Sequence, residues 1–237
     1  MICGYMHVYQ VNNWANIVER QLYRIKKSGL YDKMDKLYIG LIGTEPTRQF
    51  GKKIEIIYQV NAPSFEQAFT LTFLHLSAHT FNGQIFYIHT KGVSHNSGEG
   101  EDGNQRDWRK LMEHYIIDRW KTCIDELEKN DVAGINWHLG EGYMKAYARN
   151  AGGTKVTPHF SGNFWWATTD YIKRLPILFP LNSKYECEFW IGKAFPKVAE
   201  LWHTGIHHHI ETYPESEYIG KIKTRYYYGS ESTYNLV

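Results

Sequence analysis

Short apolar segments alternate with helical patterns through the first 136 residues, and this alternation limits the fold more than any other feature of the chain. The helical patterns cover residues 13–28, 64–80 and 106–129. The apolar segments, each ending at glycine or polar residues, cover residues 5–10, 36–42, 53–59, 84–89 and 131–136. Because a helix that joins two neighbouring strands makes them parallel, we expect an α/β fold with a mixed, mainly parallel sheet flanked by helices.

The second half of the chain is less regular. We expect an apolar strand at 163–167 and short helices at 169–174 and 186–194, followed by a polar, tyrosine-rich tail. The sequence shows no internal repeat and no linker, and 237 residues are enough to bury one sizeable core. We therefore expect a single domain over residues 1–237.

Charge, cysteine content and hydropathy argue against several classes of protein. The net charge is +2, and no run of Lys or Arg is dense enough for a nucleic-acid-binding arm, so no nucleic-acid partner is expected. Cys3, Cys123 and Cys187 are scattered and form no CxxC pair, which fits a cytoplasmic protein. No segment approaches the roughly 20 apolar residues of a membrane span.

Several catalytic motifs are missing from the sequence. It contains no GxGxxG after the first strand, no GxxxxGK[ST] loop, no HExxH and no GxSxG. Dinucleotide-dependent oxidoreductases, P-loop enzymes, zincins and α/β-hydrolases thereby lose their main sequence support. A mainly parallel sheet binds its ligand outside the carboxyl ends of its strands, so the residues after each strand are the first candidates for a site.

One candidate is the strand end Tyr87–Gly92, with the sequence YIHTKG. It delivers His89, Thr90 and Lys91 into a loop where Gly92 allows close approach of the backbone. A cation and a hydroxyl in this position fit a diphosphate, whereas the alternative is a solvated strand end with a turn glycine.

Two arginines follow at the start of the long helix. Arg106 and Arg109 are three residues apart and lie on one helix face, where they would add phosphate contacts. The alternative is that they pair with Asp107 or Glu113.

A second candidate is the stretch Pro158–Trp166, with the sequence PHFSGNFWW. Its Ser161, Gly162 and Asn163 offer hydrogen bonds to sugar hydroxyls, and sugar rings stack on aromatic faces. Because neighbouring strand residues face opposite sides, only one of Trp165 and Trp166 can face a pocket and the other belongs to the core.

Two carboxylates lie in the segment Tyr185–Gly192 (YECEFWIG). A partly buried glutamate can have its pKa raised towards the value that a general base needs, and Glu188 is our candidate for that role. Acidic residues are also common at helix starts because of the helix dipole, and this explains Glu186 as a structural residue beside the acceptor site.

Histidines cluster near the C-terminus, at His203 and at His207–His209. Such a cluster invites a metal site, for which His203 is the candidate. Three consecutive histidines cannot all face one ion in an extended chain, and no Asp or Glu lies beside them at a zinc-site spacing.

Six stretches occur in a characteristic order over almost the whole chain. They are HVYQVNNW, QLYRIKKSGLYDK, YIHTKG, DWRKLMEHY, HFSGNFWWAT and YECEFWIG. In these stretches the chain resembles the small GT-A-type glycosyltransferases of bacterial surface-polysaccharide clusters and of some large DNA viruses.

The resemblance implies a GT-A-like, Rossmann-type fold with a nucleotide-sugar half at about residues 1–137 and an acceptor half at about residues 138–237. Glu188 then corresponds to the base of inverting members, although the framework is shared with retaining enzymes. Residues that the resemblance and the strand ends together place at the donor are Tyr9, Gln10, Asn12, Gly43, Thr44, His89, Thr90, Lys91, Gly92 and Arg109.

The cofactor implied by the resemblance is Mn²⁺ or Mg²⁺, held against the diphosphate by an Asp-x-Asp motif. This sequence has no Asp-x-Asp, which leaves metal dependence open. Either Lys91 neutralises the diphosphate directly, or loop acids such as Glu101 and Asp102 substitute for the motif.

The sequence therefore predicts an enzyme that transfers a sugar from a nucleotide-sugar donor to a glycan or other hydroxyl acceptor. Two alternatives from other classes are a carbohydrate-binding module without catalysis and a catalytically inactive GT-A-like scaffold.

Overall fold

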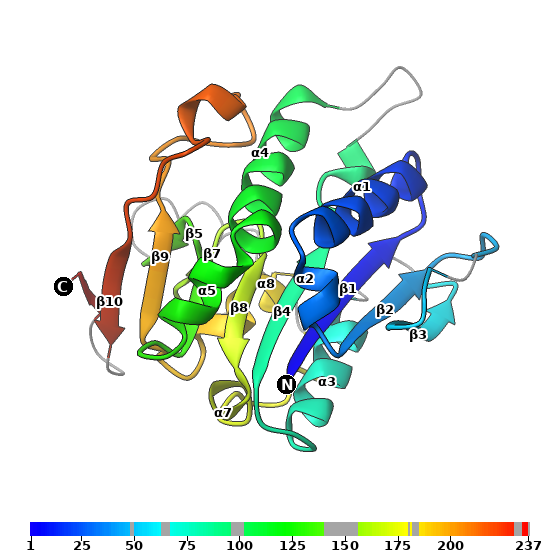
Figure 1. The fold of residues 1–237 in the computed structure, drawn as a ribbon, viewed down its shortest axis with the longest axis horizontal. Coiled ribbons are helices and arrows are strands. Elements are labelled where there is room, and N and C mark those ends of the chain that lie inside the picture. The colour runs from blue at the N-terminus through cyan, green and yellow to red at the C-terminus, as the bar shows by residue number, and fades with distance from the viewer. Residues whose placement is uncertain are drawn as a thin grey trace.

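The computed structural model describes residues 1–47, 50–62, 67–95, 102–139, 156–179, 181, 185–229 and 234–236 (Figure 1). Its centre is a nine-stranded sheet with the order β11-β10-β9-β5-β8-β4-β1-β2-β3. The strands of this sheet are β1 (Ile2–Tyr9), β2 (Lys36–Ile42), β3 (Ile54–Val60), β4 (Gln84–His89), β5 (Val132–Ile135), β8 (Trp165–Thr168), β9 (Val198–Trp202), β10 (Arg225–Gly229) and β11 (Tyr234–Leu236). A small second sheet pairs β6 (Trp137–His138) with β7 (His159–Phe160).

Most strands of the large sheet run in one direction. β3, β2, β1 and β4 are parallel to one another, and β5 is parallel to β9. Among the described strands of the large sheet, only β8 and β10 run opposite to the rest. The expected mixed, mainly parallel α/β sheet is therefore confirmed, and it pairs strands from both halves of the chain through β4–β8 and β5–β9.

Helices cover both faces of the sheet (Figure 1). On one face, α1, α4 and the segment that follows α4 pack against side chains such as Met6 and Val8 of β1. On the other face, α3, α7 and α8 pack against Tyr5 of β1 and Tyr87 of β4. The helices are α1 (Trp14–Lys27), α2 (Leu30–Lys33), α3 (Gln67–Ala78), α4 (Gly103–Glu113), α5 (Trp120–Glu126), α7 (Thr169–Ile172) and α8 (Glu186–Phe189).

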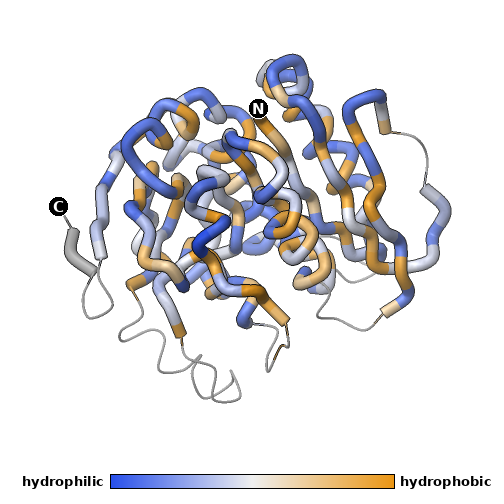
Figure 2. Tube along the Cα trace, turned by 90° about the horizontal axis from the view of Figure 1, so that it is seen from below, coloured by the Kyte–Doolittle hydropathy of each residue, from blue (hydrophilic) through white to orange (hydrophobic). Residues whose placement is uncertain are grey.

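The continuous burial of the central strands explains this three-layer arrangement, because successive side chains of a strand point to opposite faces of the sheet and both faces are covered. Along the chain, apolar stretches alternate with polar turns (Figure 2). All eight residues of β1 except its two ends are buried, as expected for a central strand covered on both sides. Within the described residues, no helix is both long and apolar enough to cross a membrane.

The long helix expected at 106–129 is interrupted. α4 begins earlier, at Gly103, because the Asp102 carboxylate caps it by accepting from the backbone N–H groups of Asn104 and Gln105. A π-helical turn at His114–Asp118 then separates α4 from α5. The helices expected at 169–174 and 186–194 are also shorter, and a 3₁₀ turn at Trp190–Gly192 follows α8. The predicted helix start at Ser64 lies outside the described residues.

Three strands of the large sheet, β9, β10 and β11, come from the segment that was expected to be a polar, tyrosine-rich tail. β9 contains the fully buried Glu200, and β10 is flanked by polar sequence. The carboxylate of Glu200 accepts from the Trp137 backbone N–H at 2.6 Å and from the Tyr227 hydroxyl at 2.7 Å. A buried acid with partners of this kind breaks the apolar pattern by which a strand is recognised.

Candidate functional site

A cavity of ≈ 320 Å³ opens at the carboxyl ends of β1 and β4. These strands are parallel neighbours in which His7 is paired with His89. The chain continues from β1 to β2 and β3 on one side and returns to β4 on the other, so the direction in which strands are added reverses between β1 and β4. Open α/β sheets bind their ligands at such a switch point.

The predicted strand end after β4 forms one wall of this cavity. His89, Thr90, Lys91 and Gly92 all line it, together with Tyr9 at the end of β1. The hydroxyl oxygen of Thr90 accepts from the backbone N–H of Tyr9 at 3.1 Å, which ties the two strand ends together. Five of the predicted donor-site residues are thus brought to one place.

His89 is held as one neutral tautomer. Its Nε2 lies 2.9 Å from the carbonyl oxygen of Gly162, and because a carbonyl only accepts, Nε2 carries the proton. Burial, together with the charge of Lys91, lowers the pKa of His89 to about 3. Burial also lowers the pKa of His7 to about 3, so both imidazoles of the paired strands are neutral at physiological pH.

The loop that carries Lys91 is fixed by its surroundings. The ammonium group of Lys91 lies over the Trp108 ring, 4.1 Å from the ring centroid, in a cation–π contact. Gly92 has a φ of +83°, and an added Cβ would lie 2.8 Å from the Cβ of Gln105. Glycine is therefore required at this position both by the backbone and by the close approach of α4.

Arg109 supports this loop from behind instead of lining the cavity. Its Nη1 donates to the carbonyl oxygen of Lys91 at 2.7 Å, and its Nε lies 3.6 Å from Glu113 Oε1. Gln21 Nε2 donates both to Glu113 at 3.1 Å and to the carbonyl oxygen of His89 at 3.1 Å. Arg109 thus makes the alternative pairing with Glu113 in place of the predicted phosphate contact. Glu113 in turn positions Arg109 and Gln21, which donate to the carbonyl oxygens of Lys91 and His89.

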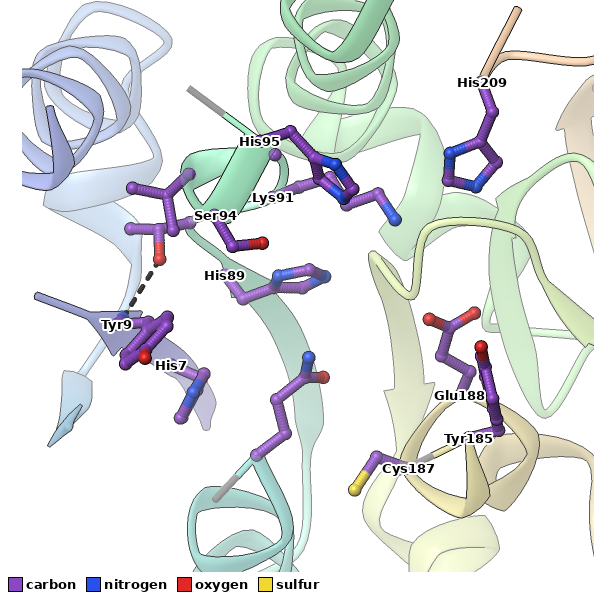
Figure 3. Close-up of a pocket in the computed structure, with 14 residues that line it drawn as sticks. His7, Tyr9, His89, Lys91, Ser94, His95, Tyr185, Cys187, Glu188 and His209 are labelled. Carbon is purple, nitrogen blue, oxygen red and sulfur yellow. Dashed lines mark hydrogen bonds between the residues drawn. The ribbon is translucent and has the colours of Figure 1, made fainter. Parts of the chain in front are cut away.

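The opposite wall comes from the segment around α8. Tyr185, Cys187 and Glu188 line the cavity there. Figure 3 shows the Glu188 carboxylate directed into the space that faces Lys91 and His209. Burial raises the pKa of the Cys187 thiol to about 12, so this group is a neutral thiol and not a nucleophilic thiolate. The two residues predicted to be catalytic, Lys91 and Glu188, therefore line the same cavity from opposite sides.

Glu186 lies outside the cavity. It is 6% exposed, and its carboxylate lies 3.5 Å from Lys193 Nζ. This agrees with the structural role that a helix start gives to one of the two acids.

Most of the predicted acceptor stretch is structural as well. Trp165 and Trp166 are both fully buried on opposite faces of the sheet, so neither reaches the cavity. The Trp165 indole stacks on Tyr87 and donates to Asn163 Oδ1 at 2.8 Å. The Trp166 indole donates to the carbonyl oxygen of Ile116 at 2.8 Å.

The turn before β8 does not line the cavity but supports its walls, since the carbonyl oxygen of Gly162 accepts from His89. Gly162 has a φ of +87°, and an added Cβ would lie 2.5 Å from Met112 Sδ. Asn163, with a φ of +59°, donates to the carbonyl oxygen of Cys187 at 3.2 Å and so joins this turn to α8. Ser161 is half-buried, and its backbone N–H donates to the carbonyl oxygen of Asn136.

A second cavity of ≈ 290 Å³ lies beside the loops predicted to hold the nucleoside. It is lined by Trp14, Phe50 and Glu45, whose carboxylate accepts from the Trp14 indole at 2.7 Å. Gln10 donates to the carbonyl oxygen of Glu45 at 3.1 Å and so shapes the loop. Asn12 donates to the carbonyl oxygen of Val93 at 2.8 Å, which joins the two predicted donor loops.

Gly43 and Thr44 are placed differently. Gly43 has a φ of +135° and packs against Gln10, while Thr44 is exposed beside the second cavity and lines neither cavity.

Three histidines were missed as cavity residues. His7, His95 and His209 line it. The strand that carries His7 and the run His207–His209 were both recognisable in the sequence, but neither was assigned to this cavity. The ring centroids of His95 and His209 are 6.4 Å apart. Burial and the charge of Lys91 lower the pKa of His209 to about 4. Nothing in the local sequence connects His209 with β4, because the chain reaches this position only after it has passed through β9.

The described residues do not fit a magnesium or manganese site. His203, the candidate ligand, bonds Glu200 through its Nδ1 at 2.8 Å. Among the described residues, no group of three or more His, Cys, Asp or Glu side chains is arranged to hold a metal ion. Asp102 caps α4, and Glu101 lies outside the described residues. Mg²⁺ and Mn²⁺ prefer oxygen ligands, whereas the described cavity wall supplies mainly imidazoles and an ammonium group.

A family model described as a domain of unknown function (DUF8361) matches residues 5–186, well over half of the chain. The chain belongs to this family. The DUF8361 match includes the carboxyl-terminal part of β1, all of β4 and the turn before β8, whereas Glu188 and His209 lie beyond its last residue. No curated protein and no solved structure matches the chain.

Proposed function

We propose that this protein is a glycosyltransferase with a GT-A-like fold that moves a sugar from a nucleotide-sugar donor to a hydroxyl acceptor. The observation that carries this proposal is the shared cavity of Lys91 and Glu188. The two residues are almost 100 positions apart in the sequence, and each was singled out independently for a role that transfer requires. Their cavity lies at the switch point of the sheet, where α/β enzymes bind nucleotides.

The proposed reaction is a direct displacement. The Glu188 carboxylate takes the proton of the acceptor hydroxyl, whose oxygen forms a bond to the anomeric carbon. The bond from that carbon to the diphosphate oxygen breaks, and the leaving nucleoside diphosphate keeps the electron pair. The ammonium group of Lys91 stabilises the charge that develops on the leaving oxygen. Attack from the side opposite the leaving group inverts the anomeric configuration.

A bound metal ion would supply Lewis-acid stabilisation of the same leaving group. The described side chains of the cavity do not form a site for one, so no step is assigned to it.

The carbohydrate-binding alternative is less well supported. A sugar-binding module needs exposed aromatic faces, but Trp165 and Trp166 are both fully buried. His89, Thr90 and Lys91 would also be left without a role in such a module.

The first test is a thermal-shift screen against UDP, GDP, dTDP and CMP and their sugars, each in EDTA, Mg²⁺ or Mn²⁺. A ligand that binds only the folded protein raises its stability by about 2.7 kcal/mol at a hundredfold excess over Kd. A shift with one nucleotide class supports the donor assignment. If no nucleotide shifts the midpoint under any condition, the transferase proposal is refuted.

Glu188→Gln then tests the mechanism. Loss of a general base is expected to lower kcat by about 10²–10⁴-fold while donor binding is retained. Glu186→Gln is the matched control, because it makes the same chemical change on the same helix outside the cavity. Equal turnover of the Glu188→Gln variant and the wild type would remove Glu188 from the mechanism.

A further inference from the structure

One corner of the cavity combines three groups that can carry positive charge. Lys91 comes from the loop after β4, His95 from the 3₁₀ turn Val93–His95, and His209 from the segment after β9. Figure 3 shows the side chains of all three directed towards the same open space. This corner is therefore assembled from parts of the chain that are more than 100 residues apart in sequence.

The corner is held in place by Trp108 and Gln105 of α4. The Lys91 ammonium lies 4.1 Å from the centroid of the Trp108 ring, and the His209 ring meets the same indole edge-to-face at 5.0 Å. Gln105 Nε2 lies 3.2 Å from His209 Nδ1. In the neutral ring Gln105 Nε2 donates to Nδ1, so Nε2 carries the proton that can be donated to an anion. The second proton of the imidazolium enters at Nδ1, and the Gln105 amide then turns to accept it with Oε1, which has no hydrogen-bond partner among the described residues.

Charge balance indicates what this corner binds. The diphosphate of a nucleotide sugar is a dianion, and Lys91 supplies one positive charge. The described lining residues form no cluster of ligands for a metal ion, and their one carboxylate, Glu188, lies on the opposite wall. A second positive charge is available if an imidazole in the corner takes up a proton.

We infer that Lys91, His95 and His209 form a metal-independent diphosphate site in which anion binding is coupled to protonation of His209. The identity of the natural ligand as a nucleotide sugar rests on the proposed function. The anion site itself rests on the geometry of the corner.

The groups around His209 give the sign of the coupling. Without ligand, burial and then the charges of Lys91, His207 and His95 together lower the pKa of His209 to about 4, although Glu188 acts in the opposite direction. His209 is therefore neutral in the empty site at pH 6 to 7. A bound dianion favours the imidazolium and raises this pKa, so binding takes up a proton and weakens as the pH rises. The effect is at most about tenfold in Kd per pH unit.

The test is calorimetric titration of the intact protein with inorganic pyrophosphate in EDTA at pH 6 and pH 7. Wild type is compared with His209→Gln, and His79→Gln is the matched control because His79 is an exposed residue at the end of α3 and does not line the cavity. Pyrophosphate itself changes its protonation between the two pH values, but this change is the same for all three proteins. The ratio of Kd values between two proteins therefore reports only the contribution of the substituted histidine. Between pH 6 and pH 7, we expect the Kd of the wild type and of His79→Gln to rise more than the Kd of His209→Gln. The difference between these increases is expected to be up to about tenfold.

A measurement on the unaltered protein guards against a folding defect in the variant. The imidazole resonances of the wild type are followed by NMR against pH with and without pyrophosphate, and one histidine pKa is expected to rise on binding. Lys91→Gln is expected to weaken pyrophosphate binding by more than about tenfold. Binding only in the presence of Mg²⁺ or Mn²⁺, or the same pH dependence in wild type and His209→Gln, overturns the inference.

These outcomes separate the two proposals. Pyrophosphate binding with proton uptake, but no turnover of any nucleotide sugar, would retain the anion site and refute the transferase. Sugar transfer that requires a metal ion and shows no dependence on His209 would retain the transferase and refute the anion site.

Discussion

Replacing Glu113 with glutamine is expected to destabilise the protein strongly, although the substitution preserves the shape of the side chain. Glu113 and Arg109 are both fully buried, and the guanidinium groups of Arg20 and Arg24 lie 3.4 and 3.7 Å from the same carboxylate. Burial lowers the pKa of Arg109 to about 10, so Arg109 remains charged at neutral pH. Removing one partner of a buried ion pair leaves an uncompensated charge and costs about 3–5 kcal/mol.

Glu55→Gln provides the matched control for Glu113→Gln. Glu55 pairs with Lys36 at 3.4 Å, but the two side chains are 54% and 43% exposed. An exposed ion pair contributes at most about 1 kcal/mol. Both variants are compared with the wild type by urea unfolding, using the midpoint at an unchanged m-value.

The result that would refute this reasoning is a similar loss of stability in both variants, within about 1 kcal/mol. Such a result would mean that the charge of Glu113 contributes little and that its hydrogen bond with Gln21 is sufficient. A further expectation follows from the contacts of Arg109 and Gln21 with the carbonyls of Lys91 and His89. Glu113→Gln should weaken pyrophosphate binding even under conditions where the variant is fully folded.

Three further predictions concern stability. Gly162→Ala should lower the free energy of unfolding by about 1–2 kcal/mol or more, because Gly162 has a φ of +87° and Met112 occupies the space of the new Cβ. Urea unfolding measures this loss, and an unchanged free energy of unfolding would contradict the prediction. Because the pKa of His7 and of His89 is about 3 in the folded protein and about 6.5 when unfolded, stability should fall between pH 6.5 and pH 3, by up to about 1.4 kcal/mol per pH unit for each histidine. His89→Asn should flatten this dependence in urea unfolding at several pH values, and an equally steep loss in the variant would count against the assignment. Asp102→Ala should cost about 1 kcal/mol through loss of the α4 cap, and a melting temperature equal to that of the wild type would show that the cap contributes nothing.

The sequence was sufficient to predict the alternation of strands and helices up to β5. Each of these strands is a short apolar segment bounded by polar residues, and local pattern alone identifies such segments. The strands β9 and β10 escaped prediction because their burial depends on distant partners. Glu200 is stable in the core because Trp137 and Tyr227 donate to it and His203 bonds it through Nδ1. The π-helical turn after Glu113 was missed for the same reason, since no local residue preference marks it.

In the candidate site, the residues that follow strands could be predicted from the sequence. Residues whose exposure depends on tertiary packing could not. Lys91 and Glu188 line one cavity because Lys91 follows a strand and Glu188 lies near a helix start, and both are at the carboxyl edge of the sheet. Arg109, Trp165 and Trp166 have the chemistry of ligand-binding residues, but all three are buried. His209 reaches the cavity through a long-range return of the chain, which no spacing rule describes.

The position of β8 has a consequence for how the polypeptide can be divided or synthesised. β4 obtains its second neighbour only from β8, about 80 residues later. A fragment that stops at residue 137 would leave the edge of β4 without a partner, although Ile85 to Ile88 are fully buried in the complete fold. An unpaired apolar edge of this kind is a template for aggregation. The proposed donor half is therefore expected to be insoluble when expressed alone, and a nascent chain must shield β4 until β8 has left the ribosome.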